Sequence, residues 1–170
     1  MKLDRKGIVY ISALTILAIL IMAYLFINFN IPTTDMLFFW SILTIIVESL
    51  LIMLPNDSVG VSVGSAINLA SIIVGGPLLG TISASLGFLF RFPYVPNHGR
   101  VHLFNTPFYI TIFNISQSII VTGFMGLIYI WTGGIIGEFS FVQAILILIL
   151  GTLINTSIIS GLMSILKKEN

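Results

Sequence analysis

The chain has 170 residues, of which 57% are hydrophobic and only 8% are charged, and its formal net charge is +1. Soluble domains carry roughly 25% charged residues, so this composition excludes an ordinary soluble protein. With its long apolar runs, it indicates an all-α integral membrane protein with a single transmembrane domain, residues 1–170. The small net charge and the lack of a basic run exclude nucleic acid as a partner. The chain has no cysteine, which excludes disulfides and thiol catalysis.

Six apolar segments predict a bundle of about six transmembrane helices. A helix needs about 20 apolar residues to cross the roughly 30 Å of hydrocarbon in a bilayer. Four segments have about this length or more, whereas two in the middle of the chain are shorter. The predicted spans are, in chain order, 7–29, 36–54, 63–74, 77–90, 107–131 and 141–166. The first apolar run is longer than the core of a signal peptide, so we expect it to be retained as a span.

The segments between the spans carry loop and helix-start signals. Thr34 or Asp35 is expected to cap the second span, and Asn105 or Thr106 the fifth, because hydroxyl and carboxylate side chains accept bonds from the first amide groups of a helix. The sequence PNDS at 55–58 is typical of a loop. Valine alternates with glycine and serine over 59–63, which favours a few extended residues.

The two short central segments are joined at Gly75-Gly76-Pro77 and are rich in small residues. Backbone groups freed at a break cost several kcal/mol in hydrocarbon, so we expect this broken pair to be packed inside the bundle. Gly76, Gly80 and Ala84 recur every four residues, and Gly87 falls close to the same face. Such a ridge either packs closely against another helix or forms one wall of a ligand cavity.

The basic residues predict the topology. Six crossings place all seven on the side of both termini, and Asp35 and Glu138 on the other side. Lysine and arginine are enriched in cytoplasmic loops, so we expect a multi-pass protein of the plasma membrane with both termini cytoplasmic. Four spans plus a re-entrant hairpin would give the same charge pattern. We assign lipid headgroup contacts or coupling to a cytoplasmic partner to the basic residues Arg91, Arg100, Lys167 and Lys168.

Polar side chains inside the apolar segments are the candidate site. Glu48 is the acidic residue within a long apolar run, and a carboxylate there usually faces the protein interior with a partner. Asn114 and Ser118 share a helix face with Thr122, and Gln117 lies beside it. These side chains either join helices through hydrogen bonds or line a small polar cavity. The candidate ligand-binding residues are Glu48, Asn68, Asn114, Gln117 and Ser118, and Asn155 accompanies them in the last span.

Catalytic and metal-binding signatures are lacking in the sequence. His98 and His102 lie four residues apart, but no nearby Cys, Asp or Glu completes a ligand set. Phosphate-binding loops, serine nucleophile motifs and paired-carboxylate sites are also missing. We therefore expect neither enzyme activity nor a cofactor. The expected partners are the bilayer and a small apolar or amphipathic ligand.

One stretch of the sequence resembles a known bacterial membrane region. The resemblance rests on Leu54-Pro55 with the valine–serine stretch after it, on Gly-Pro-x-x-Gly at 76–80, and on Phe-Asn-x-x-Gln at 113–117. These motifs, within about 48–134, are similar to the amino-terminal sensor region of some HD-GYP phosphohydrolases and GGDEF cyclases. The resemblance implies a sensing module. Those proteins continue into a soluble catalytic domain, so we expect a detached sensor region or a stand-alone relative acting with a partner.

A second resemblance concerns the segment from Ile72 to Gly87. It is similar to substrate-binding S-components of energy-coupling factor vitamin transporters, which have six helices and an apolar run ending in Gly-Pro. This implies a capture subunit for a vitamin or related metabolite that associates with a transmembrane coupling protein. Three hypotheses therefore stand: a signal-input module, a transporter capture subunit, and a structural or assembly protein that binds no ligand.

Overall fold

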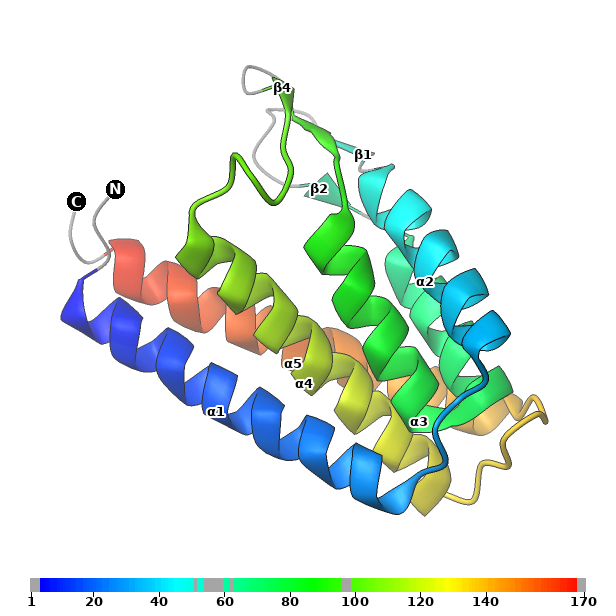
Figure 1. The fold of residues 1–170 in the computed structure, drawn as a ribbon. Coiled ribbons are helices and arrows are strands. Elements are labelled where there is room, and N and C mark those ends of the chain that lie inside the picture. Colours follow the sequence, from blue (N-terminus) through cyan, green and yellow to red (C-terminus); the bar gives the residue numbers. More distant parts are fainter. Residues whose placement is uncertain (1–3, 51, 54–59, 62, 96–98, 168–170) are drawn as a thin grey trace.

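The computed structural model describes residues 4–50, 52–53, 60–61, 63–95 and 99–167. These residues form an all-helical bundle with two minimal β-hairpins (Figure 1). The helices are α1 (Arg5–Asn28), α2 (Thr34–Ser49), α3 (Gly64–Phe90), α4 (Phe108–Trp131) and α5 (Phe141–Lys167). The strands β1 (Ile52–Met53) and β2 (Gly60–Val61) pair antiparallel, as do β3 (Tyr94–Val95) and β4 (Gly99–Arg100). The predicted loop at 55–58, His98 and Lys168 lie outside the described residues.

Four of these helices, α1, α3, α4 and α5, are long and apolar enough to cross a membrane. The prediction for the second span was wrong at its end. Helix α2 stops at Ser49 rather than at residue 54, because the chain leaves the helix and pairs Ile52 with Val61. At 16 residues, α2 is shorter than a helix that spans a bilayer unaided. Glu48 therefore lies in the last turn of α2 and not two turns before its end.

The predicted break between the two short segments is confirmed within α3. Gly76 has φ 86° and ψ 178°, a conformation that is essentially restricted to glycine, and Pro77 follows it. The two arms of α3 fold back on each other. A Cβ atom built on Gly80 would lie 2.4 Å from Ile72 Cγ1, whereas residues eight apart in a straight helix are separated by about 12 Å. Figure 1 shows the two arms as an antiparallel pair, with the first arm behind α2 and the second arm between α2 and α4.

The small residues of α3 pack closely, but not as one continuous ridge. Gly76 is the turn itself, so it does not lie on the helix face of Gly80 and Ala84, which belong to the second arm. Gly80 packs against the first arm. Gly87 packs against α2, where an added Cβ would lie 2.4 Å from Thr44 Cγ2. The broken pair is buried, as expected, because both arms are covered by α2 and α4.

The turn of α3 lies against the α4–α5 loop. The amide group of Gly137 donates a hydrogen bond to the carbonyl oxygen of Ile73 over 2.7 Å. Gly126 of α4 lies so close to Pro77 that an added Cβ would come within 2.7 Å of Pro77 Cα. Both contacts bring the α3 turn to the end of the bundle where α4 finishes and α5 begins.

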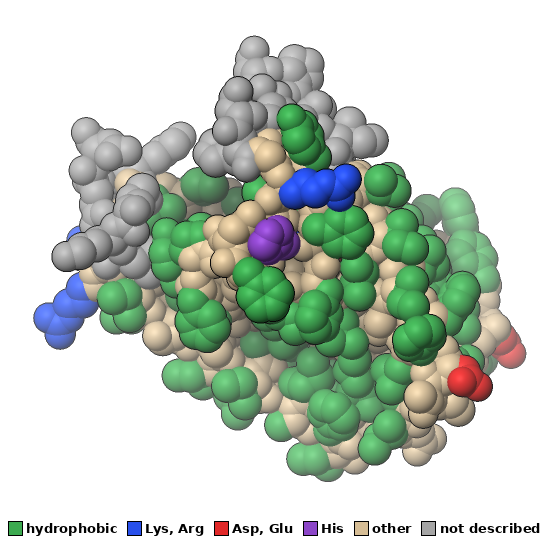
Figure 2. Space-filling model, turned by 45° about the horizontal axis from the view of Figure 1, so that its top comes forward, with side chains coloured by type: hydrophobic (Ala, Val, Ile, Leu, Met, Phe, Trp, Pro, Cys, Tyr) green, Lys and Arg blue, Asp and Glu red, His purple; other side chains and the backbone are tan. Residues whose placement is uncertain are grey.

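Several described basic residues lie at the end of the bundle opposite to Asp35 and Glu138. Arg5 and Lys6 at the start of α1 and Arg100 in the β3–β4 hairpin lie toward one end, whereas Asp35 and Glu138 lie toward the other (Figures 1 and 2). The surface between them is mostly hydrophobic in Figure 2. This arrangement agrees with the predicted separation of Arg5, Lys6 and Arg100 from Asp35 and Glu138, which is the same for six spans and for four spans with a re-entrant hairpin.

The expected side-chain caps of two helices are not formed. Helix α2 begins after Thr33 and α4 after Pro107, and neither capping residue makes a side-chain hydrogen bond. The hydroxyl group of Thr106 instead donates to the carbonyl oxygen of His102. Helix α1 has the conventional cap, because the carboxylate of Asp4 accepts bonds from the first amide groups.

Candidate functional site

A cavity of about 500 Å³ lies between both arms of α3, α4, α5 and the end of α2. All five residues predicted as ligand-binding line it: Glu48, Asn68, Asn114, Gln117 and Ser118. These five residues come from three helices and meet at one place, although they are widely spaced in the sequence. The cavity volume falls within the range of about 300–1,000 Å³ that is usual for small-molecule sites.

An ion pair forms one wall of this cavity. Arg91 Nη1 lies 3.9 Å from Glu48 Oε2, and the two side chains are 24% and 4% exposed. The guanidinium also lies 4.6 Å from the centre of the Phe88 ring, close enough for a cation–π contact. Burial lowers the pKa of Arg91 from its usual value, and the charge of Glu48 acts in the opposite direction. Arginine remains fully protonated at neutral pH, so the wall presents a guanidinium cation beside the carboxyl group of Glu48.

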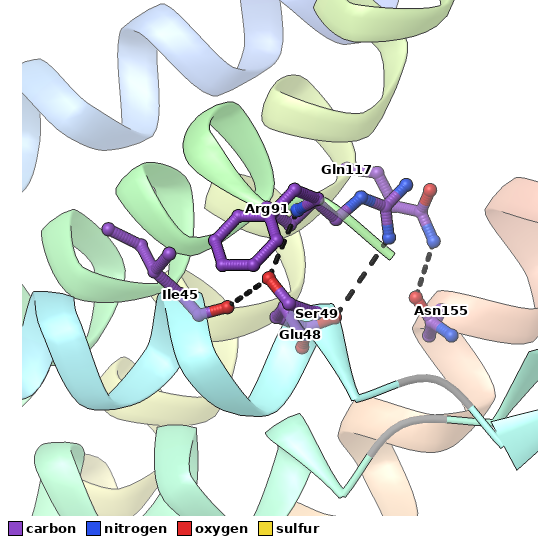
Figure 3. A network of polar contacts seen from close by, with 7 residues as sticks. Ile45, Glu48, Ser49, Arg91, Gln117 and Asn155 are labelled. Carbon is purple, nitrogen blue, oxygen red and sulfur yellow. Dashed lines mark hydrogen bonds and ion pairs between the residues drawn. The ribbon is translucent and has the colours of Figure 1, made fainter. Parts of the chain in front are cut away.

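Arg91 lies in the cavity wall, although the sequence placed it in the polar loop after the fourth predicted span. Its position at the start of a polar loop suggested an exposed coupling residue. It directly follows the last residue of α3, and its amide group still donates to the carbonyl oxygen of Gly87. The amide group of Phe92 donates to Ser49 Oγ over 3.0 Å, which ties the loop to the end of α2. The Arg91 side chain consequently turns into the bundle beside Glu48 (Figure 3).

The ion pair leaves hydrogen-bonding capacity on Arg91. A separation of 3.9 Å allows attraction but exceeds a hydrogen-bond distance. Guanidinium groups carry five N–H donors in a planar fork. Within the described part of the chain, no hydrogen bond from this guanidinium is found. Its donors are thus available to a molecule in the cavity.

Two amide side chains join α4 to α5 across the cavity. Gln117 Nε2 donates a short hydrogen bond to Asn155 Oδ1, and both residues line the cavity (Figure 3). Helix α5 packs mainly on α4 and makes little contact with α3. The wall of the cavity formed by α5 is consequently held largely by its contacts with α4, this hydrogen bond among them.

Two further oxygen atoms of lining residues are buried without a partner. Among the residues that the structure describes, Asn68 Oδ1 and Ser118 Oγ find no hydrogen-bond partner, and their residues are only 7% and 4% exposed. Nearly all buried polar atoms in proteins are paired, because an unpaired one costs about 1–3 kcal/mol. Both residues line the cavity, so the buried oxygen atoms without partners belong to its wall.

The rest of the wall is apolar or consists of small polar residues. Phe88, Val121, Met125, Leu148 and Ile159 provide apolar surface, and Ser65, Thr122, Gly151 and Thr152 complete the lining. The cavity therefore presents charges and amides in one part and hydrocarbon in another. This combination suits a small amphipathic molecule.

The charged part of the cavity lies toward the basic end of the bundle. Glu48 and Arg91 are at the ends of α2 and α3, and Asn114 is in the second turn of α4. A crevice of about 80 Å³ shares Phe88, Arg91 and Asn114 with the cavity. Its other walls include residues of the loop before α4, among them His102 and Thr106. The polar wall thus continues toward the end that carries Arg100.

The remaining predicted residues lie outside the cavity. Gly80, Ala84 and Gly87 are buried between helices, which favours the packing role over the cavity-wall role. Arg100 is exposed, and its guanidinium lies 5.9 Å from the Phe92 ring. The ring of His102 accepts a hydrogen bond from the amide group of Phe104. In the described ranges, no group of three or more His, Cys, Asp and Glu residues could hold a metal ion.

Sequence reasoning missed the position of Arg91 in the cavity wall and gave Asn155 only a supporting place. A signal for Asn155 was present, since an amide inside an apolar span needs a partner. No comparable signal existed for Arg91, because loop arginines are usually solvated.

Comparison with known proteins gives no relative for this chain: no protein-family model matches it, and neither does any curated protein or solved structure.

Proposed function

We propose that the protein is a membrane-embedded module that binds a small amphipathic molecule and transmits its occupancy as a movement of α5. The observation that carries this proposal is the convergence of Glu48, Arg91, Asn68, Gln117 and Ser118 on one cavity. A purely structural protein gains nothing from such a cavity, since buried polar groups without partners destabilise a fold.

Helix α5 is the element most suited to respond to a ligand. Only 17% of the residues in its most apolar 18-residue stretch are buried, compared with 61% for the corresponding stretches of α3 and α4. It contributes Gly151, Thr152 and Asn155 to the cavity, so a ligand there would contact α3, α4 and α5 together. A ligand that binds more tightly when α5 lies close to α3 shifts the equilibrium toward that arrangement.

The position of the cavity favours sensing over capture for uptake. Its charged part lies near Arg91 and Arg100, and the positive-inside rule assigns that end to the cytoplasm. We infer that the ligand enters from the cytoplasm. A capture subunit for uptake would instead present its polar wall at the end that carries Asp35 and Glu138.

Native mass spectrometry of the protein released from lipid nanodiscs tests ligand binding. The protein is first incubated with a low-molecular-mass cell extract. We expect a small-molecule adduct on the wild type that is lost from Asn114→Leu, because leucine removes a polar contact and narrows the cavity. Asn28→Leu is the matched control, since Asn28 is exposed at the end of α1. Equal adducts on all three proteins, or none on any, would contradict the proposal.

A further inference from the structure

We propose that the ligand is a small zwitterion of the α-amino acid type with an apolar side chain. This inference rests on the proposed function and specifies the chemistry of the same cavity. It follows from the pairing of opposite charges in the wall and from the hydrocarbon surface beside them.

The charges of the wall come as a closely spaced pair. Arg91 and Glu48 are 3.9 Å apart and both line the cavity. An α-amino acid carries its carboxylate and its ammonium group on one carbon atom, so its two charges are also close together. The carboxylate fits the unused N–H donors of Arg91, because guanidinium and carboxylate groups form two parallel hydrogen bonds. The ammonium group then lies beside the Glu48 carboxylate, which has several acceptor positions.

The neighbouring polar side chains complement the same two groups. Asn68 Oδ1 is a buried acceptor without a partner, as an ammonium group requires. Ser118 Oγ is also unpaired, and its hydroxyl group can donate to a carboxylate. Binding of a zwitterion would therefore satisfy atoms that the protein alone leaves without hydrogen bonds.

Other ligand classes fit this wall less well. A phosphate or a simple carboxylate can pair with Arg91. Such a ligand carries no positive group of its own to offset its repulsion with Glu48. An organic cation leaves the donors of Arg91 unused. An uncharged hydrocarbon would bury both charges and the amides without new partners, which is costly. A zwitterion adds no net charge to a wall that is itself neutral.

The apolar surface accommodates the rest of the molecule. Met125, Leu148 and Ile159 line the cavity alongside the polar residues. Methionine side chains adapt their shape to different apolar groups, so the site can accept branched or aromatic side chains. L-Leucine is accordingly a suitable probe, because it combines the zwitterion with a branched hydrocarbon.

The test uses analogues of leucine that each lack one charge. Binding of radiolabelled L-leucine to the full chain in lipid nanodiscs is measured by competition. 4-Methylpentanoate lacks the ammonium group, and 3-methylbutylamine lacks the carboxylate. A hydrogen bond to a charged group contributes about 1.5–3 kcal/mol, so we expect each analogue to bind roughly 10- to 100-fold more weakly than leucine. Equal competition by either analogue would overturn the inference.

Two substitutions assign the charges to their partners. Arg91→Gln should remove the preference for leucine over 3-methylbutylamine, and Glu48→Gln should remove the preference for leucine over 4-methylpentanoate. The competition series uses the wild-type protein alone. It therefore shows whether both charges of leucine contribute to binding even where a variant fails to fold. Wild-type preferences that persist in both folded variants would also overturn the inference.

The two proposals fail in different ways. An adduct in native mass spectrometry that is lost from Asn114→Leu, together with no binding of leucine, rejects the zwitterion and retains the binding module. The absence of both rejects the two together.

Discussion

The guanidinium of Arg91 lies 3.9 Å from the carboxylate of Glu48 and thereby joins the end of α3 to the end of α2. The Glu48 side chain is buried and that of Arg91 is partly buried, and both form part of the polar wall of the cavity. The contact connects the broken helix to its neighbour. In the proposed function it has a second role, because it presents one charge of each sign to a ligand in the cavity.

Removal of one charge of this pair should destabilise the protein. Breaking a buried ion pair costs about 3–5 kcal/mol, because the remaining charge stays buried alone. Since Arg91 retains some exposure, we expect Arg91→Gln to cost about 3 kcal/mol in the free energy of unfolding. The double variant Glu48→Gln/Arg91→Gln should be more stable than either single variant. Reversible unfolding in mixed micelles measures the free energy of unfolding of the wild type, both single variants and the double variant. A loss in the double variant equal to the sum of the two single losses would argue against a direct interaction between the two side chains.

Close packing between α4 and the α3 turn should make Gly126 sensitive. An added Cβ would lie 2.6 Å from Pro77 Cβ and 2.7 Å from Pro77 Cα, and the rigid proline cannot move away alone. Overpacking of this kind costs about 1–3 kcal/mol, so Gly126→Ala should lower the unfolding temperature.

Gly151→Ala is the matched control for Gly126→Ala. Its Cβ would first meet Met125 Sδ, which belongs to a flexible side chain. The gain in helix propensity from glycine to alanine, about 1 kcal/mol, should offset the energetic cost of the remaining close contact. An equal loss of stability in both variants would contradict the specific role of the Gly126–Pro77 contact.

The turn at Gly76 should tolerate no side chain. A residue with a Cβ is strained by about 1–3 kcal/mol at its φ and ψ values, so Gly76→Ala should destabilise the hairpin of α3 by about that amount. An added Cβ would also lie 2.8 Å from Ile136 Cδ1. The double variant Gly76→Ala/Ile136→Ala separates the two causes. Because backbone strain does not depend on Ile136, we expect no rescue of thermal stability relative to Ile136→Ala.

Single cysteines can report the topology without interference, because the natural chain has none. We expect Arg100→Cys to react with a membrane-impermeant maleimide from the cytoplasmic side, and Glu138→Cys from the opposite side. Val74, next to the α3 turn and 43% exposed, should react from the side of Glu138 if both arms of α3 cross the membrane.

Labelling in inverted and right-side-out vesicles gives the comparison between the two sides. Reaction of Val74→Cys from the side of Arg100 would indicate a re-entrant hairpin. The contact between Gly137 and Ile73 favours crossing, since it places the turn against the loop that carries Glu138.

Much of the architecture could be predicted from the sequence, because it depends directly on the length of the apolar runs and on the glycine and proline residues that interrupt them. The long helices α1, α4 and α5 follow from runs of apolar residues, and the break in α3 follows from Gly76 and Pro77. The end of α2 could not be predicted in this way. Residues 50–54 are as apolar as the helix before them, and only the pairing of Ile52 with Val61 removes them from it.

The candidate site was predictable in its amides and in Glu48, but not in Arg91. Asn68, Asn114 and Gln117 stand out inside apolar segments, where an unpaired amide is costly, so their convergence could be anticipated. Arg91 stands among polar loop residues, and its inward direction depends on the geometry at the end of α3. That geometry comes from the hairpin at Gly76, which brings both ends of α3 to the same cavity.

The most direct test asks whether small polar molecules reach the cavity from the basic end of the bundle. Asn114→Cys places a thiol in the cavity wall, whereas Ser83→Cys places one at a fully buried position outside it. A small charged methanethiosulfonate reagent is applied to each side of oriented vesicles. We expect Asn114→Cys to react from the side on which Arg100→Cys reacts, and Ser83→Cys to remain unmodified. Failure of Asn114→Cys to react, or reaction only from the side of Glu138, would contradict a ligand site that opens toward the cytoplasm.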